Sequence, residues 1–207
     1  MTEEYKNKVM ERFDELAQSY SGSAIDFIRD KRLNLIKKHI KKDDRILEIG
    51  RGSGNLLRFI ECSNIHGLDI SKNMIKEAKK SVLSGNFSVG DAENLPYDDN
   101  FFDKVIISEV LYYLPNLDKA IKEACRVLKK DGLLLMTTLN KKYNFVKTIV
   151  NLFKIGVHDN ISMSYISFKN IRKTLEKGFK IEKVSSIPIK LMPARISMIF
   201  FIAARKI

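Results

Sequence analysis

The sequence predicts an α/β protein whose doubly wound sheet is covered by helices on both faces. Two observations predict this fold class. Short apolar runs alternate with amphipathic segments along the middle of the chain, and this strand, helix, strand repetition is typical of parallel sheets. The 207 residues, 44% hydrophobic and 30% charged, also suffice for one hydrophobic core. We therefore expect a single domain, residues 1–207, without a disordered or low-complexity tract.

Each element follows from its apolar spacing. Two helices are expected first, at residues 3–20 and 24–40, and the mainly apolar face of the second includes Arg32. Apolar runs then predict strands at residues 45–49, 65–70, 87–89, 105–108 and 133–138. Helical spacing between these runs predicts helices at residues 56–60, 74–83 and 117–128. After Asn140 we expect a largely apolar helix at 143–155, a helix at 168–177, and strands beginning at Phe179 and Ile196.

The net charge of +12 is concentrated in the last third of the chain. Residues 1–139 hold 23 Lys and Arg against 22 Asp and Glu, whereas residues 140–207 hold 14 against 3. A one-sided charge indicates an anionic partner, such as an acidic small molecule, an anionic membrane surface or a nucleic acid. The alternative is a solvated, lysine-rich face.

Cysteine use and the N-terminal residues indicate the compartment. Cys62 and Cys125 form no CxxC pair, so neither a disulfide framework nor a cysteine zinc site is expected. Residues 1–20 lack the apolar core of a signal peptide, and no apolar run is long enough to span a membrane. We expect a cytoplasmic protein without a metal.

A glycine-rich turn follows the first expected strand, in Glu48-Ile49-Gly50-Arg51-Gly52-Ser53-Gly54. Glycines at a strand-to-helix turn allow positive φ and close approach of a ligand to the backbone. The dinucleotide fingerprint GxGxxG is not matched, because the third glycine comes one position early. The Walker A pattern also fails, since no Gly-Lys-Ser/Thr follows. The turn therefore disfavours both NAD and a nucleoside triphosphate.

Acidic residues follow the next two expected strands. Asp69 ends the second strand, where a carboxylate accepts hydrogen bonds from both hydroxyls of a ribose. Asp91, in Gly90-Asp91-Ala92, ends the third and suits an exocyclic amine such as that of adenine. Ligands of open α/β sheets bind at this edge, so the three strand ends together predict a nucleoside site. Singly, each acid is equally a turn or helix-capping residue.

Four segments carry a family resemblance: "ILEIGRGSGN", "GLDIS", "GDAENLPYDDNFFDKVIISEVLYYL" and "LPNLDKAIKEACRVLKKDGLLLMTT". Together with residues from about 10 onward, they resemble the class I S-adenosylmethionine-dependent methyltransferases, particularly the small-molecule branch that includes quinone-biosynthesis enzymes. The resemblance implies a Rossmann-like, mostly parallel seven-stranded sheet with an antiparallel last strand. It also divides the domain into N-terminal helices (1–40), a cofactor-binding core (41–139), a substrate lid (140–168) and a closing helix and strands (169–207).

By this resemblance, S-adenosylmethionine, which yields S-adenosylhomocysteine, is bound by Tyr20, Glu48, Gly50, Gly52, Asp69, Ile70, Asp91, Ala92 and Ser108. Glu48 and the glycines line the methionyl part, Asp69 holds the ribose, and Asp91 meets adenine. Tyr20 stands with Phe13 and Ala17 on a helix whose tyrosine closes over the cofactor in the family. The same spacing also suits a stripe that packs in the core.

Arg51 departs from the family pattern, which has a small residue between these glycines. A guanidinium beside a sulfonium would be repelled by it. We therefore expect Arg51 either to pair with the carboxylate of the cofactor or to point to solvent.

Methyl transfer from a sulfonium is an in-line displacement that depends mainly on holding the acceptor close and aligned. A base helps when the acceptor is a hydroxyl or an acidic carbon. The candidate bases are Glu109, Tyr112, Tyr113, His158, Asp159 and Tyr165. His158 is a candidate because the ordinary pKa of a histidine lies near neutral pH, and its alternative role is that of a surface histidine. Tyr112 or Tyr113 alternatively packs in the core.

The expected acceptor is a small, apolar or anionic molecule recognised by the lid at residues 140–168. Its apolar helix and flanking lysines suit a lipid-like acceptor or peripheral contact with an anionic membrane; the alternative is a buried structural helix. Nucleic acid is disfavoured because Ser108-Glu109-Val110-Leu111 lacks the Asn/Asp-Pro-Pro-Tyr/Phe motif. An RNA-directed methyltransferase, a non-catalytic cofactor-binding protein and a nicotinamide oxidoreductase remain as alternatives.

Overall fold

The structure is a computed structural model that describes residues 3–18, 26–53, 56–82, 84–139, 166–187 and 199–207. The helices are α1 (Glu3–Leu16), α2 (Asp26–Lys37), α3 (Lys72–Ser81), α4 (Leu117–Val127) and α6 (Phe168–Leu175), with single 3₁₀ turns η1 (Leu57–Phe59) and η2 (Leu111–Tyr113). The strands are β1 (Arg45–Ile49), β2 (Asn64–Asp69), β3 (Asn86–Val89), β4 (Phe102–Ser108), β5 (Leu128–Leu139), β6 (Phe179–Ile187) and β7 (Ile199–Lys206).

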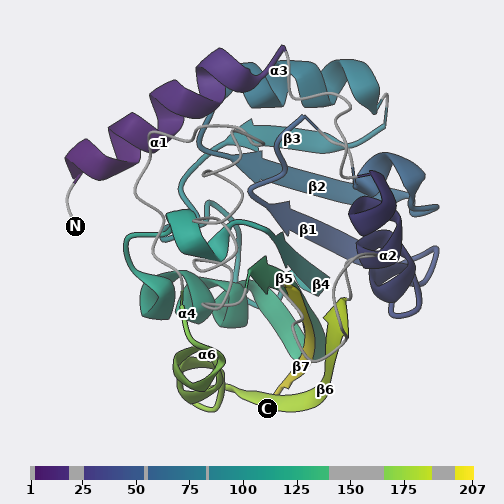
Figure 1. Ribbon diagram of the computed structural model, residues 1–207. Helices are drawn as coiled ribbons and strands as arrows, with labels where there is room; N and C mark the ends of the chain where they lie inside the picture. Colours follow the sequence, from purple (N-terminus) through teal and green to yellow (C-terminus); the bar gives the residue numbers. More distant parts are fainter. Residues whose placement is uncertain (1–2, 19–25, 54–55, 83, 140–165, 188–198) are drawn as a thin grey trace.

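All of these strands form one sheet of seven strands in the order β3-β2-β1-β4-β5-β7-β6 (Figure 1). The first five pair in parallel, while β7 runs antiparallel to both β5 and β6. The predicted fold class, with its antiparallel last strand, is confirmed. The carboxyl ends of β1 to β5 consequently meet at one edge of the sheet, which we call the carboxyl edge.

Two hydrophobic cores lie on the two faces of the sheet, as alternation along each strand requires. One core packs Ala120 and Ile121 of α4 and Leu175 of α6 against the sheet. The other packs Ile36 of α2 and Ile75 of α3. Figure 1 shows this arrangement, with α2 on one side of the sheet and α4 and α6 on the other. The structure is therefore doubly wound.

The connection after β1 differs from the prediction. The helix expected at residues 56–60 is only the 3₁₀ turn η1, with Leu57 fully buried. Residues 50–63 alone connect β1 to β2, and a parallel crossover of that length leaves no room for a long helix. The helix expected at 3–20 likewise ends earlier, at Leu16.

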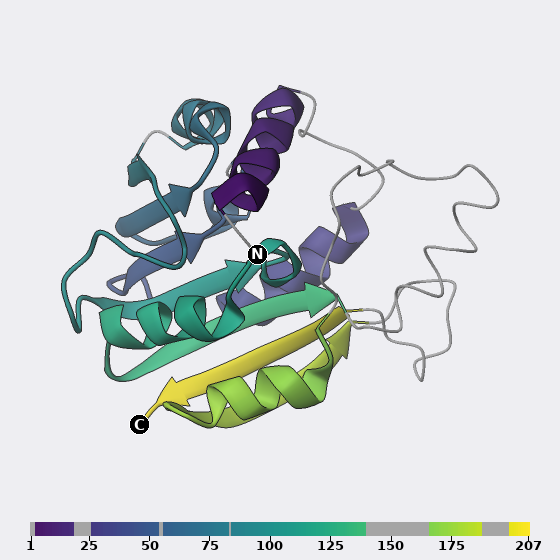
Figure 2. The same cartoon turned by 90° about the vertical axis from the view of Figure 1, so that its left-hand side faces the viewer.

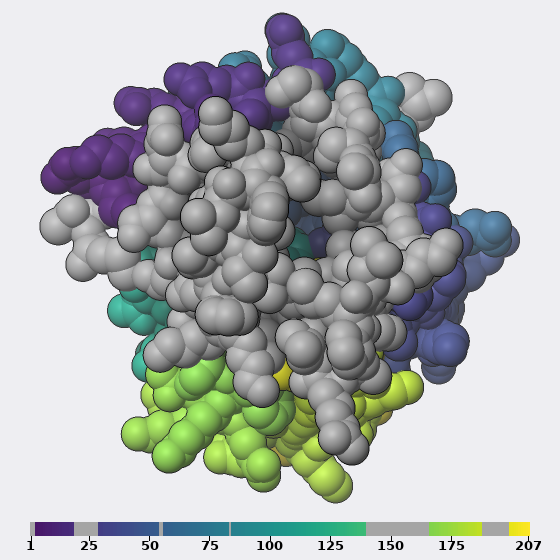
Figure 3. Space-filling view, in the orientation of Figure 1, coloured from purple at the N-terminus to yellow at the C-terminus, as the bar shows by residue number. Residues whose placement is uncertain are grey.

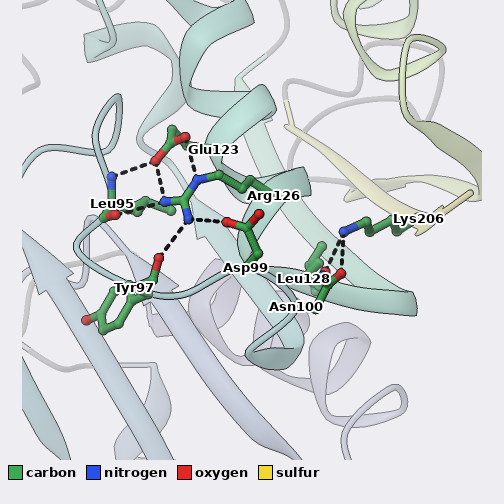
Figure 4. Close-up of polar contacts among 8 residues, drawn as sticks. All are labelled: Leu95, Tyr97, Asp99, Asn100, Glu123, Arg126, Leu128 and Lys206. Atoms are coloured by element: carbon green, nitrogen blue, oxygen red, sulfur yellow. Dashed lines mark hydrogen bonds and ion pairs between the residues drawn. The ribbon is translucent and has the colours of Figure 1, made fainter.

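Arg126, near the end of α4, joins this helix to the loop after β3 (Figure 4). Its guanidinium donates to Leu95 O at 2.9 Å, to Tyr97 O at 2.7 Å, and to the carboxylates of Asp99 and Glu123. Glu123 in turn accepts from Leu95 N at 2.9 Å. These bonds fix the connection into β4.

Helix α1 lies beside α3 and near the carboxyl edge, as the side view shows (Figure 2). On the face drawn in Figure 3, the surfaces of α1 and α2 lie on opposite sides, with α6 and β6 below them. No helix among the described residues is long and apolar enough to cross a membrane.

Several predictions concern residues that the structure does not describe. They are the lid and its apolar helix, Tyr20, His158, Asp159, Tyr165 and the start of the last strand at Ile196.

Candidate active site

The glycine turn after β1 forms one wall of the carboxyl edge. Gly50 and Gly52 have φ of 67° and 56°, in the left-handed region that favours glycine. A Cβ on Gly50 would lie 2.1 Å from Cγ2 of Val110, so the turn packs directly against the segment after β4. Gly50 N donates to Leu68 O at 2.8 Å and fixes the turn to the end of β2.

Asp69 lies at the end of β2 and faces this turn. Its Oδ2 accepts from Gly52 N at 2.7 Å and its Oδ1 accepts from Ser71 N at 3.0 Å. The residue is only 7% exposed, and burial raises the pKa of its carboxyl, against hydrogen bonds from the backbone of Ser71, Gly52 and Ile70. A carboxylate has about four acceptor positions, so capacity for a further donor remains.

Asp91 lies at the end of β3 and already has two partners. Its Oδ1 accepts from Glu93 N at 2.8 Å, and its Oδ2 pairs with the ammonium of Lys6 at 2.6 Å. Lys6 comes from α1 and also contacts Oε2 of Glu93 at 3.0 Å. The Asp91 side chain is still 34% exposed, so an amine donor has access to it. Next to it, Ala92 is buried and provides an apolar surface.

Glu48 and Arg51 form a buried ion pair beneath the glycine turn. Nη1 of Arg51 lies 3.0 Å from Oε2 of Glu48, and both side chains are at most 3% exposed. The guanidinium stacks 4.2 Å from the centre of the Phe87 ring. Its stem lies over Gly67, where a Cβ would come within 2.1 Å of Cδ of Arg51. The expectation that Arg51 points to solvent is therefore wrong, because the absence of a side chain at Gly67 leaves room for the stem of Arg51 inside the protein.

Burial governs the ionisation of this pair. It raises the pKa of Glu48 to about 7, against the attraction of Arg51, and the neighbouring carboxylate of Asp69 adds to the rise. Burial also lowers the pKa of Arg51. Within the described residues, Nε and Nη2 of Arg51 have no hydrogen-bond partner.

Glu109, directly after β4, is held in an unusual backbone conformation. Its φ is 60°, in a region that non-glycine residues seldom adopt and that often marks a functional position. Glu109 N donates to Thr137 O at 2.9 Å, which fixes the residue to β5. The pKa of the carboxyl is raised by burial, against the attraction of Arg32.

The carboxylate of Glu109 is only partly satisfied. Its Oε2 accepts from the hydroxyl of Tyr112 at 3.4 Å, and Nη1 of Arg32 lies 3.7 Å from its Oε1. Oε1 is buried and has no hydrogen-bond partner in the part of the chain that the structure describes. Nearby, the hydroxyls of Ser108 and Thr137 share a hydrogen bond of 2.9 Å. Tyr112 is itself buried, and the ring of Tyr113 packs against it at a tilt.

The carboxyl edge thus collects every described residue that the sequence indicated. Three that the sequence did not indicate lie there too: Lys6 on Asp91, Arg32 on Glu109, and Asp14, which accepts from Asn73 N at 3.0 Å beside Ser71. Arg32 had a detectable signal, because it is a charged residue on the apolar face of its helix. No sequence pattern indicated the contacts of Lys6 and Asp14, which join positions 57 to 85 residues apart.

Comparison with known proteins identifies the family. A family model described as a methyltransferase domain matches residues 47–136, which run from β1 through the glycine turn to β5. The chain belongs to the class I S-adenosylmethionine-dependent methyltransferases. S-adenosylmethionine is therefore the cofactor of this enzyme.

Two relatives and one solved structure illustrate the similarity of this methyltransferase to others. An uncharacterised Methanocaldococcus jannaschii protein, MJ1123, is 34% identical over 195 residues, which cover 87% of this chain and 92% of the relative. The ubiquinone/menaquinone biosynthesis C-methyltransferase UbiE of Neisseria meningitidis is 31% identical over 160 residues, covering 68% of this chain and 63% of UbiE. A Thermotoga maritima SAM-dependent methyltransferase has the same fold, with a TM-score of 0.74 and 21% identity. The match covers 95% of this chain and 98% of the Thermotoga chain.

Proposed function

We propose that this methyltransferase methylates a small, apolar or anionic acceptor held beside Glu109 at the carboxyl ends of β4 and β5. The observation that carries the proposal is Glu109, whose backbone has a positive φ and whose partly buried carboxylate has one buried oxygen without a hydrogen-bond partner among the described residues. A buried oxygen that accepts no hydrogen bond costs folding free energy unless a ligand donates a hydrogen bond to it.

The residues of the carboxyl edge fit the cofactor. Asp69 keeps acceptor capacity for a ribose hydroxyl, and the exposed part of Asp91 suits the adenine amine. Glu48, Gly50 and Gly52 then face the amino-acid end, where a carboxylate suits an ammonium. Ile70 and Ala92 flank the adenine, and Ser108 offers its backbone carbonyl; Tyr20 is assigned here only by resemblance.

The protein's part in the reaction is alignment, desolvation and proton removal. When bound, S-adenosylmethionine supplies an electrophilic methyl group on its sulfonium sulfur. That sulfur is the leaving group and becomes a neutral thioether. The acceptor forms the new bond to the methyl group and loses one proton if it is a hydroxyl or an acidic carbon. Glu109 takes that proton, and the hydroxyl of Tyr112 at 3.4 Å holds its carboxylate in place. A base whose pKa is raised from its usual range works nearer to neutral pH.

The chemistry of the acceptor is inferred from charge and from the relatives. Residues 140–207 carry 14 Lys and Arg against 3 Asp and Glu, which favours an anionic molecule or one bound at an anionic lipid surface. The UbiE relatives act, by their name, in quinone biosynthesis, and this supports aromatic, quinone-like acceptors. His158 and Asp159 remain proposed contributors from the lid.

The test begins with calorimetric titration of S-adenosylmethionine, S-adenosylhomocysteine and NAD into the wild type and Asp69→Ala. We expect micromolar binding of the first two ligands, lost in the variant, and no binding of NAD. An acceptor screen with quinone-like and lipid-like compounds and with RNA then follows, monitored by release of S-adenosylhomocysteine.

Glu109→Gln is the decisive variant in that screen. It keeps the shape of the side chain but cannot take a proton, so we expect unchanged cofactor affinity and turnover reduced about 100-fold or more. Unchanged turnover would contradict the role of Glu109. Cofactor binding without turnover of any compound would instead favour a non-catalytic binding protein, and turnover of RNA alone would favour the RNA-directed alternative.

A further inference from the structure

Arg51 is bonded too sparsely for an arginine whose purpose is only structural. Arg126 donates to two backbone carbonyls and two carboxylates, and its guanidinium holds a loop in place. The side chain of Arg51 is more deeply buried, yet among the described residues its guanidinium makes a single hydrogen bond, to Glu48. Because burying a charge is costly unless it is paired, the one partner of Arg51 indicates what the residue is for.

The surroundings of Arg51 direct its guanidinium toward Glu48. Gly67 of β2 leaves the space that the stem occupies, and the ring of Phe87 of β3 supports the cation at 4.2 Å. Glu48 pairs with Gly67 across β1 and β2, and Gly67 pairs with Phe87 across β2 and β3, so the three positions form one row across the sheet. Arg51 lies over this row and reaches the carboxylate from the turn above it.

We propose that Arg51 is a positioning residue that keeps the Glu48 carboxylate ionised and oriented beneath the glycine turn, and that cofactor affinity depends on this pair. The proposal rests on S-adenosylmethionine as the cofactor and on Glu48 facing its amino-acid end. Arg51 then acts through Glu48 and has no direct contact with the sulfonium.

The groups that face Glu48 decide how this dependence responds to pH. They are Arg51 in the turn, Asp69 on β2 and Arg32 on α2. The pKa of Glu48 is raised to about 7 by burial and by Asp69, while Arg51 and Arg32 oppose the rise. Ionised Glu48 is therefore gained as the pH rises through about 7, and cofactor affinity should rise with it.

The experiment is calorimetric titration of S-adenosylmethionine, S-adenosylhomocysteine and 5′-methylthioadenosine from pH 5.5 to 9. The proteins are the wild type, Arg51→Met, Arg51→Lys and Glu48→Gln. Methylthioadenosine lacks the amino-acid end and reports on the nucleoside half of the site alone. S-adenosylhomocysteine lacks the positive sulfur and reports on repulsion.

For the wild type we expect affinity for both amino-acid-bearing ligands to fall about tenfold per pH unit below pH 7. Arg51→Met should move the midpoint upward by about one pH unit or more, because a nearby opposite charge is lost. Arg51→Lys should bring the midpoint part of the way back to the wild-type value. Glu48→Gln should bind both amino-acid-bearing ligands weakly and independently of pH. Methylthioadenosine should bind equally well to all four proteins.

Three outcomes would overturn the proposal. In the first, Arg51→Met binds S-adenosylmethionine more tightly relative to S-adenosylhomocysteine, which would mean that Arg51 acts by repelling the sulfonium. In the second, the midpoint does not move. In the third, the variants lose affinity for methylthioadenosine as much as for the two amino-acid-bearing ligands, which would mean that the substitutions disrupt the whole glycine turn. If the wild type binds none of the ligands, the cofactor assignment has failed instead. If Arg51→Met does not fold, Arg51→Lys and Glu48→Gln still give the comparison.

Discussion

Two carboxylates, the buried Glu48 and the partly buried Glu109, distinguish the carboxyl edge at the scale of single residues. Each follows or ends a strand of the central sheet, and each has an arginine as its principal cation. Burial raises the pKa of both carboxyls despite that arginine. An acid with a raised pKa favours the folded state at low pH and loses this contribution as the pH rises through the raised value.

The stability of the protein without cofactor should therefore depend on Glu48 between pH 4.5 and 7. The wild type should lose up to about 1.4 kcal/mol of unfolding free energy per pH unit from this group as the pH approaches 7. Glu48→Gln cannot titrate, so its profile should be flatter over the same interval. Urea unfolding at half-unit pH steps measures both profiles. Parallel profiles would contradict a raised pKa for Glu48.

The sequence predicted the residues of the carboxyl edge best where their place depends on the backbone alone. Gly50, Gly52, Asp69 and Asp91 could be found because glycines and acids at successive strand ends have a direct chemical meaning. The partner of Arg51 could not, because its course into the core depends on Gly67, a residue of a different strand. The contact is set by packing, which single-sequence patterns do not contain.

Helix α1 shows at the scale of an element how a surface helix reaches the site. Lys6 binds Asp91 and Glu93 after β3, Asp14 binds Asn73 at the start of α3, and Phe13 stacks edge-on against Tyr113 at 5.1 Å. Helix α1 is thus fixed at the ends of β2, β3 and β4. Its amphipathic spacing predicted a helix, but nothing in that spacing predicted these three contacts.

We expect Lys6→Met to loosen α1. The variant leaves Asp91 and Glu93 without their cation, and the loss of a mostly buried pair should cost about 1 to 2 kcal/mol. Hydrogen exchange of the amides of α1, measured with urea unfolding, reports both effects. The matched control is Lys8→Met, whose pair with Glu4 is 66% and 74% exposed and should contribute little. Equal effects of the two substitutions would exclude a special role for Lys6.

Arg126 is the corresponding fixed point on the loop that leads from β3 into β4 (Figure 4). Replacement by Met leaves two backbone carbonyls and two carboxylates without their donor, so we expect a loss of about 3 kcal/mol in unfolding free energy. Arg126→Lys should restore only a part, because lysine lacks the planar set of donors. Arg172→Met removes an exposed pair with Glu176 and should change the free energy by about 0.5 kcal/mol or less.

At the scale of the whole molecule, one sheet separates and supports both cores. The alternation of β7 places Ala203 and Phe201 in one core and Ala204 and Ile202 in the other. The number of strands and the antiparallel β7 followed from family resemblance, and the order of the strands was not predicted, since periodicity alone predicts strands but not their neighbours. What periodicity did predict correctly is the alternation of strands and helices that makes the sheet doubly wound.

Because both cores share the same strands, unfolding should be a single cooperative transition. Circular dichroism and tyrosine fluorescence, followed through urea unfolding, should give coincident curves with one midpoint. Separated midpoints would show that the β6–β7 part of the sheet unfolds independently of the rest.

The position of β7 between β5 and β6 also has a kinetic consequence. Strands β3, β2, β1, β4 and β5 are contiguous in the sheet and precede β6 and β7 in the chain, so they can assemble while the chain is still being synthesised. Strand β6, in contrast, has no neighbour in the sheet until β7 has emerged. The exposed edge of β5 and the waiting β6 are the surfaces on which a nascent chain is most open to aggregation.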